Sequence, residues 1–247
     1  MRYLLVCFVF FALTQCSTPT QTTLNPLDLI PAKPLAILHT EDMESLVEFS
    51  NSQPQLRRFL HPFVSVEEHW LSFQECIVSY HEEGIEENKY LLIRPLASLD
   101  SFPQLVGDTL RYENLPVIRF EKQGIDRYAV VYQNTYLESD SKILIENSIR
   151  LHTAPKRPDE NLQKLYNSKT GPFQLFINER SKTMLTEKFK TVIPFNISDF
   201  SSWVSIQPEI ENGNTIFNTI GLLSEEKLTK MSLVTNQAHD LSKLLSN

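Results

Sequence analysis

Pairs of strand-like segments separated by short turns constrain the fold of this chain more than any other feature of its sequence. From residue 74 onwards, apolar and polar residues tend to alternate with a period of two, and a short polar or glycine-containing turn lies inside each pair. Asn and Gly are typical of such turns because they tolerate positive φ angles. The pairs are 75–83 with 88–96, 116–123 with 127–134, and 203–211 with 215–223. They predict three β-hairpins in an antiparallel sheet. Because the alternation is incomplete, we expect helices to cover one face and water to reach part of the other.

Segments with helical spacing lie before and between these hairpins. After an apolar run at 34–40, Thr40 is the expected cap of a helix whose apolar positions include Met43 and Leu46. Pro62 is expected to break a second helical segment, because proline has no backbone N–H to donate. The remaining expected elements are helices at 54–73, 99–110, 139–152, 158–167 and 179–190 and a strand at 172–178. The fold class that follows is α+β, with antiparallel β-hairpins forming a sheet packed with helices.

The C-terminal segment 224–245 has the pattern of an amphipathic helix. Ser224 is suited to cap it, and two glutamates follow at the positive end of the helix. An apolar stripe follows at Leu228, Met231, Ala238, Leu241 and Leu245. We expect this stripe to pack on the core. The alternative, a face that lies on a membrane, is disfavoured because the polar side of the helix is not strongly basic.

The first sixteen residues indicate where the protein resides. Arg2 precedes eleven almost wholly apolar residues, 3–13, whereas a helix needs about 20 apolar residues to cross a bilayer. This pattern predicts a secretory signal peptide. The segment 13–16, Leu-Thr-Gln-Cys, resembles the lipobox of bacterial lipoproteins, in which the cysteine, here Cys16, is acylated and becomes the mature N-terminus. Gln15 stands where that pattern has Gly, Ala or Ser. The alternatives are an ordinary cleaved signal peptide, a buried strand and an uncleaved anchor.

These features give an expected domain organisation. Residues 1–15 form a lipoprotein signal peptide, 16–29 a flexible tether rich in Thr and Pro, and 30–247 a single α+β domain with a subdomain boundary near 153–158. The resemblance of the leader to a lipobox implies a protein of the bacterial cell envelope, held in a membrane by palmitate or another acyl chain, with its domain facing the periplasm.

The net charge disfavours nucleic acid as a partner, and the number of cysteines disfavours a disulfide within the chain. The net charge of −7 repels nucleic acid phosphates, so nucleic acid is not an expected partner. Cys7 leaves with the signal peptide and Cys16 carries the lipid, so Cys76 has no partner for a disulfide within the chain. Its apolar neighbours indicate a small buried side chain. A reactive thiol is the alternative, and nearby glutamates disfavour it.

The sequence contains no recognisable catalytic motif. Its six glycines are too dispersed for a phosphate-binding loop, and the Gly-x-Ser-x-Gly motif of hydrolases is absent. His61 and His69 share a helical segment with two glutamates, but Pro62 interrupts it, so we expect solvated side chains rather than a metal site. Residues 81–88 include four glutamates without the spacing of a calcium loop, and the glycosylation-like triplet 196–198 is expected to be accidental. We therefore predict no catalytic residue, metal or cofactor.

The segment 29–49, LIPAKPLAILHTEDMESLVEF, resembles the opening of a functionally uncharacterised domain family of bacterial envelope proteins. In that family an Ile-Pro pair, here Ile30 and Pro31, precedes a short strand and a helix with spaced leucines. Weaker similarities lie at 141–151, 173–178, 203–210 and 236–237. Family members often continue into a repetitive β-rich region that this chain lacks. The resemblance implies no catalytic residues.

Three hypotheses follow for the function. The leading one is a non-enzymatic lipoprotein tethered through Cys16, whose domain binds a protein or another component of the envelope. The second is a carrier of an apolar ligand or lipid in a cavity between sheet and helices. The aromatic residues expected to line that cavity are Phe120, Tyr128, Tyr132, Phe173 and Phe176. The third is a divergent hydrolase that uses His and Glu side chains from the segment 61–69.

Overall fold

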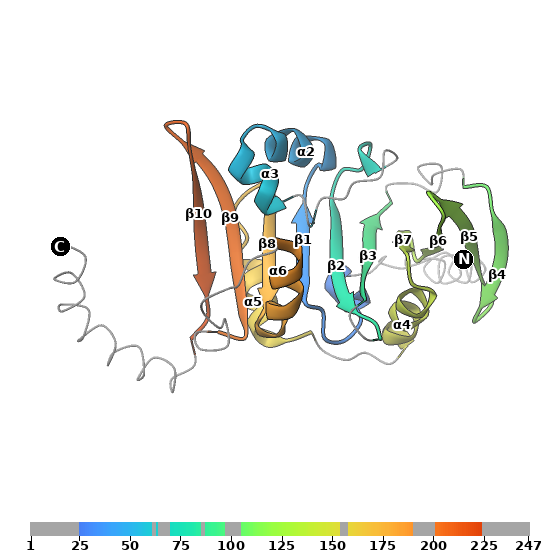
Figure 1. The fold of residues 1–247 in the computed structure, drawn as a ribbon. Coiled ribbons are helices and arrows are strands. Elements are labelled where there is room, and N and C mark those ends of the chain that lie inside the picture. The colour runs from blue at the N-terminus through green and yellow to red at the C-terminus, as the bar shows by residue number, and fades with distance from the viewer. Residues whose placement is uncertain are drawn as a thin grey trace, which may run out of the picture.

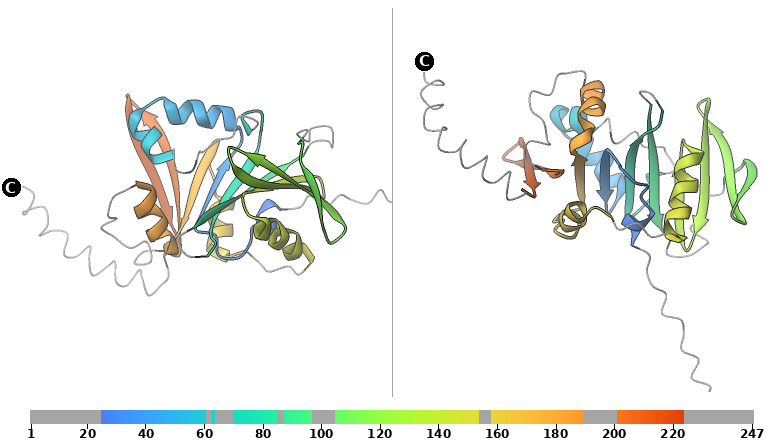
Figure 2. Two further views of the ribbon diagram at one scale, coloured as in Figure 1. Left: turned by 45° about the vertical axis from the view of Figure 1, so that its right-hand side comes forward. Right: turned by 90° about the horizontal axis from the view of Figure 1, so that it is seen from below.

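A computed structural model describes residues 25–60, 63, 70–84, 87–96, 105–153, 158–189 and 201–223. These residues form one ten-stranded antiparallel sheet with helices on both faces, which confirms the predicted α+β class (Figure 1, Figure 2). The strands are β1 (Ala36–Thr40), β2 (Cys76–Glu82), β3 (Asn88–Pro95), β4 (Asp108–Tyr112), β5 (Leu115–Lys122), β6 (Ile125–Tyr132), β7 (Thr135–Ser139), β8 (Phe173–Asn178), β9 (Trp203–Glu211) and β10 (Asn214–Gly221). The helices are η1 (Pro26–Leu29), α2 (Met43–Asn51), α3 (Pro54–Leu60), α4 (Lys142–Thr153), α5 (Glu160–Asn167), η4 (Glu179–Ser181) and α6 (Lys182–Phe189).

The first strand of the chain lies inside the sheet rather than at its edge. The strand order is β10-β9-β8-β1-β2-β3-β7-β6-β5-β4. β1 pairs with β2 on one side and with β8 on the other, so that Leu38 lies opposite both Val78 and Leu175. Residues that are more than 130 positions apart in the sequence are therefore neighbours in the middle of the sheet.

Four hairpins of the described chain have two-residue turns in which both residues have positive φ angles. These turns are Glu113-Asn114, Gln123-Gly124, Gln133-Asn134 and Asn212-Gly213. Such turns match the natural twist of paired strands. The three predicted hairpins are confirmed as β2–β3, β5–β6 and β9–β10. The helix predicted at 99–110 is wrong for residues 108–110, which belong to β4, and β7 was not predicted.

The other predicted elements agree with the structure, apart from one cap and the end of the helix predicted at 54–73, because α3 ends at Leu60 and the described residues 63 and 70–73 are not α-helical. Helices are found at the expected positions of α2, α3, α4, α5 and α6, and β8 is the expected strand. The cap of α2 is Asp42, whose carboxylate accepts from the backbone N–H of Glu44 (3.1 Å), and not Thr40. Thr40 instead donates its hydroxyl proton to the Asp42 carbonyl (2.8 Å). The predicted C-terminal helix lies outside the described residues.

Helices cover both faces of the central strands. On the face that we call the α3 face, α2, α3 and α6 contribute apolar side chains to a core that includes Leu46, Leu60 and Met184. On the opposite α5 face, η1, α4 and α5 contribute side chains such as Ile145 and Leu165. Every residue of β1, β7 and β8 is buried as a result. The expectation of one partly wet face is therefore wrong for the centre of the sheet, where two helical layers exclude water.

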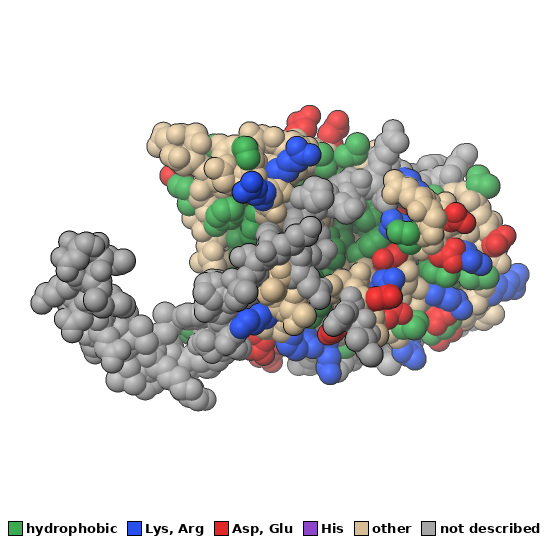
Figure 3. Space-filling view, in the orientation of Figure 1, with side chains coloured by type: hydrophobic (Ala, Val, Ile, Leu, Met, Phe, Trp, Pro, Cys, Tyr) green, Lys and Arg blue, Asp and Glu red, His purple; other side chains and the backbone are tan. Residues whose placement is uncertain are grey.

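Exposure increases towards the outer strands. Most residues of β10 are exposed, and Ile216, Phe217 and Ile220 are each between 37% and 47% accessible to solvent. In the space-filling view, hydrophobic side chains are visible below α3 at this side of the molecule (Figure 3). The Phe217 ring packs against that of Phe59 in α3, with 4.7 Å between centroids. This contact holds the β9–β10 hairpin against the α3 face. Within the described residues, no helix is long and apolar enough to span a bilayer.

Candidate functional site

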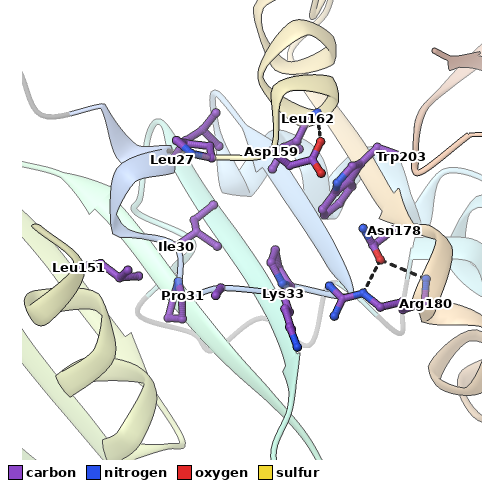
Figure 4. A pocket seen from close by; sticks show the side chains of 13 residues that line it. Leu27, Ile30, Pro31, Lys33, Leu151, Asp159, Leu162, Asn178, Arg180 and Trp203 are labelled. Carbon is purple, nitrogen blue, oxygen red and sulfur yellow. Dashed lines mark hydrogen bonds between the residues drawn. The ribbon is translucent and has the colours of Figure 1, made fainter. Parts of the chain in front are cut away.

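A pocket of about 280 Å³ lies on the α5 face, where the loop between η1 and β1 meets the start of α5 and the end of β8 (Figure 4). We call it the Lys33 pocket. Its apolar wall consists of Leu27, Ile30, Pro31, Leu151, Leu162 and Trp203. Its charged and polar side chains are Lys33, Asp159, Asn178 and Arg180. The pocket therefore combines an apolar wall with a cationic end, which is the arrangement typical of binding sites for small molecules.

Arg180 is held in place by the residue that ends β8. The backbone N–H and the Nε of Arg180 both donate to Asn178 Oδ1, over 3.1 and 3.0 Å. With Nε used in this way, the two terminal nitrogens of the guanidinium group point towards the Lys33 side chain (Figure 4). Among the residues that the structure describes, neither Lys33 nor Arg180 forms an ion pair. Two cations without carboxylate partners thus lie at one end of the pocket.

The one carboxylate of the pocket wall is engaged by a helix. Asp159 accepts from the backbone N–H groups of Asn161 (2.9 Å) and Leu162 (3.2 Å), which makes it the cap of α5. Its charge is therefore partly compensated by the positive end of that helix. Asp159 does not neutralise Lys33 or Arg180, and the end of the pocket at these residues remains positive.

The backbone at Lys33 is strained. Its φ angle is 64°, in the left-handed region that costs a residue with a side chain about 1–2 kcal/mol. The next residue is Pro34, and residues before proline normally adopt extended conformations. The conformation is held in place because Leu35 donates to the Tyr80 carbonyl (2.8 Å) and accepts from the Asn178 N–H (2.9 Å). Strain of this kind is concentrated at ligand-binding sites, so it marks Lys33 as a candidate functional residue.

A second hollow of about 470 Å³ adjoins the first on the α4 side of the loop. It is also lined by Lys33 and Arg180, and it adds His81, Glu82 and Arg150 among others. His81 is buried beside Ser79, and burial lowers the pKa of its imidazole to about 4. His81 is therefore neutral at pH 7, and Lys33 and Arg180 lie where the two hollows meet.

Several of the residues singled out from the sequence lie outside the described part of the chain. Cys16, the predicted lipidation site, and the pair His61 and His69 are among them. In the glutamate-rich turn, residues 85–86 are not described, and Glu87 pairs with Lys89 (3.2 Å). Within the described ranges, no group of three or more His, Cys, Asp or Glu side chains is arranged to hold a metal ion.

Cys76 is a buried free thiol in β2, as its apolar neighbours in the sequence predicted. Burial raises the pKa of this thiol to about 12, and the nearby charge of Arg94 opposes this shift only in part. The thiol therefore stays protonated at neutral pH. A protonated buried thiol is neither a nucleophile nor a metal ligand, so the reactive alternative lacks chemical support.

The five aromatic residues expected to line one cavity lie on both faces of the sheet. Phe120 and Phe173 belong to the core of the α3 face. Phe176 belongs to the core of the α5 face, against which Tyr128 and Tyr132 also pack. The sheet separates these two sets, so they cannot line a common cavity. The rings fill the core instead, and none of them lines the Lys33 pocket.

A buried carboxylate in β7 was not noticed in the sequence. Glu138 is fully buried on the α3 face, and its two oxygens accept from the Trp70 indole (3.2 Å), the Tyr90 hydroxyl (3.2 Å) and the Tyr136 hydroxyl (2.5 Å). The Arg127 guanidinium lies over the Tyr90 ring, 5.0 Å from its centroid. The only sequence signal was an acidic residue in a strand whose neighbours are apolar. We call this group the Glu138 cluster.

A second buried polar group lies on the α5 face around His39 of β1. Lys169 Nζ lies 2.8 Å from His39 Nε2 and 4.4 Å from the Tyr166 ring centroid. Burial is the main cause that lowers the pKa of His39, and the charge of Lys169 adds to it. An ammonium group can only donate, so Nε2 accepts and the imidazole proton resides on Nδ1. Glu75 lies 3.4 Å from the same Nε2 and 3.9 Å from Lys169, with which it pairs. We call this group the His39 cluster.

Two polar atoms of the His39 cluster have no hydrogen-bond partner within the part of the chain that the structure describes. They are His39 Nδ1 and Oε1 of Gln174, the residue opposite His39 in the pairing of β1 with β8. The Nε2 amide of Gln174 donates to the Ser205 hydroxyl. A buried donor and a buried acceptor on adjacent strands thus both lack a partner, which is rare in folded proteins.

Comparison with known proteins gives one structural match. No protein-family model matches the chain, and no curated protein matches it. The resemblance to an uncharacterised envelope family therefore stays a prediction. The crystal structure of the Treponema protein TP0453 is similar at 10% sequence identity, with a TM-score of 0.48 over 87% of this chain and 87% of that chain.

Proposed function

We propose that the protein is a non-enzymatic lipoprotein of the bacterial cell envelope whose folded part binds an envelope component in the Lys33 pocket. The observation that carries the binding role is the pair of cations, Lys33 and Arg180, which form no ion pair with a described carboxylate and lie beside an apolar wall at a strained loop. The residues that line this pocket include no Ser, Thr, Cys, His or Tyr. Asp159 is engaged as the cap of α5, and Lys33 and Arg180 are suited to hold an anionic ligand.

The membrane attachment in this proposal depends on Cys16. The leader is too short to span a bilayer and ends at this cysteine. The described residues begin at Asn25, whose side chain caps η1 by accepting from the Leu27 N–H (3.1 Å). Nine residues of extended chain reach about 30 Å at most. An acyl group on Cys16 would therefore keep Asn25 within about 30 Å of the membrane surface. Leu27, two residues further on, lines the Lys33 pocket.

Labelling with radioactive palmitate tests the attachment. We expect the wild-type chain to incorporate the label and Cys16→Ala to lose it. Cys76→Ala is the matched control, because it removes a buried cysteine of the folded part and should leave the incorporation unchanged. A mature protein that starts at another residue, or one that carries no acyl chain, would contradict the proposed anchor.

The binding role has a separate test. A pull-down from detergent-solubilised envelope with the wild-type protein is compared with the same experiment on Arg180→Ala. The proposal requires that at least one envelope component is captured by the wild-type protein and is not captured by Arg180→Ala. Identical recovery by the two proteins would count against the Lys33 pocket as the binding site.

A further inference from the structure

We infer that the Lys33 pocket binds the phosphate or carboxylate group of an amphiphile, with the apolar part of that molecule against Ile30, Leu162 and Trp203. This inference rests on the proposed binding role of the pocket and names the chemical class of the ligand. It requires a site for the anionic group, a site for the apolar group and a charge that orients the ligand between them. The described residues provide all three.

The anion site consists of Lys33 and Arg180. Arg180 uses Nε to donate to Asn178, so that its terminal nitrogens remain available on the side that faces Lys33 (Figure 4). Two parallel N–H groups of a guanidinium match the spacing of two oxygens in a phosphate or carboxylate. The Lys33 ammonium adds a point charge beside them. Both side chains are exposed at the mouth of the pocket, so an anion reaches them without displacing part of the fold.

The apolar site lies on the other side of the pocket. Ile30, Leu162 and Trp203 come from the η1–β1 loop, α5 and β9, and each is at most 9% accessible to solvent. In the close-up view they lie around the pocket away from the end of the Lys33 side chain (Figure 4). A polar molecule would leave these side chains without a matching partner. An alkyl or aromatic group removes both their remaining surface and its own from water.

Asp159 sets the direction in which such a ligand binds. Its carboxylate lies near the apolar wall, at the start of α5, and repels an anion from that end of the pocket. The anionic group is therefore directed to Lys33 and Arg180 and the apolar group to the opposite wall. A neutral amphiphile gains only the apolar part of this interaction, and inorganic phosphate only the ionic part.

Calorimetric titration of the full chain with hexyl phosphate and hexanoate tests the inference. Hexanol and inorganic phosphate serve as the matched ligands that lack the anion or the apolar chain. We expect at least one of the two anionic amphiphiles to bind at least tenfold more tightly than hexanol and than inorganic phosphate. Arg180→Ala should weaken binding tenfold or more, because a hydrogen bond to a charged group is lost. Lys164→Ala, an exposed lysine of α5 that does not line the pocket, should leave the affinity unchanged.

Lys33→Gly separates ligand binding from stability. Glycine adopts the φ angle of 64° without strain, so this variant should retain or raise the urea midpoint of unfolding. It should nevertheless weaken hexyl phosphate binding about tenfold, because the ammonium group is gone. Equal affinity of Lys33→Gly, Arg180→Ala and wild type for the anionic amphiphiles would overturn the inference. So would equal affinity for hexanol and hexyl phosphate, or no binding of either anionic amphiphile.

A final arm identifies the source of the ligand. The lipidated protein is placed in phosphatidylcholine vesicles with or without phosphatidic acid, and hexyl phosphate is titrated again. A lipid headgroup as the natural ligand predicts weaker hexyl phosphate binding when phosphatidic acid is present, whereas a soluble amphiphile predicts the same affinity in both. Palmitate labelling and these titrations are independent measurements. A negative labelling result would contradict the anchor at Cys16, whereas a negative titration would contradict the proposed class of ligand.

Discussion

The Glu138 cluster and the His39 cluster are two buried polar groups on opposite faces of one sheet, and they differ in how completely their central side chains, Glu138 and His39, are paired. Both Glu138 oxygens accept hydrogen bonds from aromatic side chains. In the other cluster, His39 Nδ1 and Gln174 Oε1 have no hydrogen-bond partner among the described residues. A buried charge contributes to a unique fold only when its hydrogen bonds are complete. We therefore expect the Glu138 side chain to contribute more to a unique fold than the side chains of His39 and Gln174 do.

The two faces also differ in the kind of titratable group that they bury. The α3 face buries the carboxylate of Glu138, and the α5 face buries the imidazoles of His39 and His81. The environment of each histidine lowers its pKa, chiefly through burial. Mild acid should therefore act first on the α5 face, which is also the face that contains the Lys33 pocket.

The largest effect is expected from Glu138→Ala. This change removes the carboxylate to which the Trp70 indole and two tyrosine hydroxyls donate, which should lower the free energy of unfolding by about 3–5 kcal/mol. Urea denaturation followed by circular dichroism measures it. Glu138→Gln keeps the shape of the side chain and one acceptor oxygen, so its free energy of unfolding should fall by less than that of Glu138→Ala. A loss below about 1 kcal/mol in Glu138→Ala would contradict the specifying role of this cluster.

Acid should destabilise the protein through His81. Its folded-state pKa of about 4 is lower than the unfolded value near 6.5, so below pH 6.5 the unfolded chain binds the proton first. The stability that is fully present above pH 6.5 is therefore lost as the pH falls towards 4, by about 3 kcal/mol. Urea midpoints between pH 7 and pH 4 measure this loss.

His81→Gln provides the control for the acid effect. Glutamine does not titrate, so this variant should lose less stability than the wild type between pH 6.5 and 4. If the urea midpoint falls equally with pH in both proteins, groups other than His81 cause the acid sensitivity. The two faces would then not differ in their response to acid through His81.

A smaller effect is expected from Lys169→Met. Methionine keeps much of the apolar stem over Tyr166 but removes the ammonium charge that helps to lower the pKa of His39. The pKa of His39 should rise, and the stability at pH 7 should change by about 1 kcal/mol or less. Titration of the His39 ring protons by NMR measures the pKa. Lys164→Met, on the surface of α5, is the control and should leave that pKa unchanged.

The smallest effect is expected from Gln174→Leu. The change removes one unpaired acceptor and also the hydrogen bond that Gln174 donates to Ser205. These two contributions oppose each other, so the unfolding free energy should change by less than about 1 kcal/mol. Comparison with Glu138→Ala under the same urea conditions tests the difference between the clusters directly. A loss as large as that of Glu138→Ala would mean that the His39 cluster is equally decisive for the fold.

The local elements of this fold could be predicted from the sequence where side-chain period and turn chemistry agree. Asn212 and Gly213 marked the β9–β10 hairpin, and spaced apolar residues marked α2 and α4. β4 and β7 were missed because their turns, Glu113-Asn114 and Gln133-Asn134, reach positive φ angles without glycine. Their strain is compensated by strand pairing, which a local pattern does not contain.

The Lys33 pocket could not be predicted for a related reason. Ile30 and Pro31 stood out in the sequence, but the left-handed backbone of Lys33 did not, since lysine rarely adopts it. Arg180 reaches the pocket only because β8 pairs with β1, a contact between segments more than 130 residues apart. Sites assembled by such distant pairing depend on the order of the strands in the sheet, and no short motif encodes that order.

The position of β1 between β2 and β8 has a mechanical consequence. Force applied to the N-terminus, as by an anchor under tension, reaches β1 through η1 and acts along the direction of the strand. Hydrogen bonds to both neighbours lie across that direction, so two rows of them must shear together before the strand can slide. If the proposed anchor at Cys16 is correct, tension on it would act on a strand that is paired on both sides.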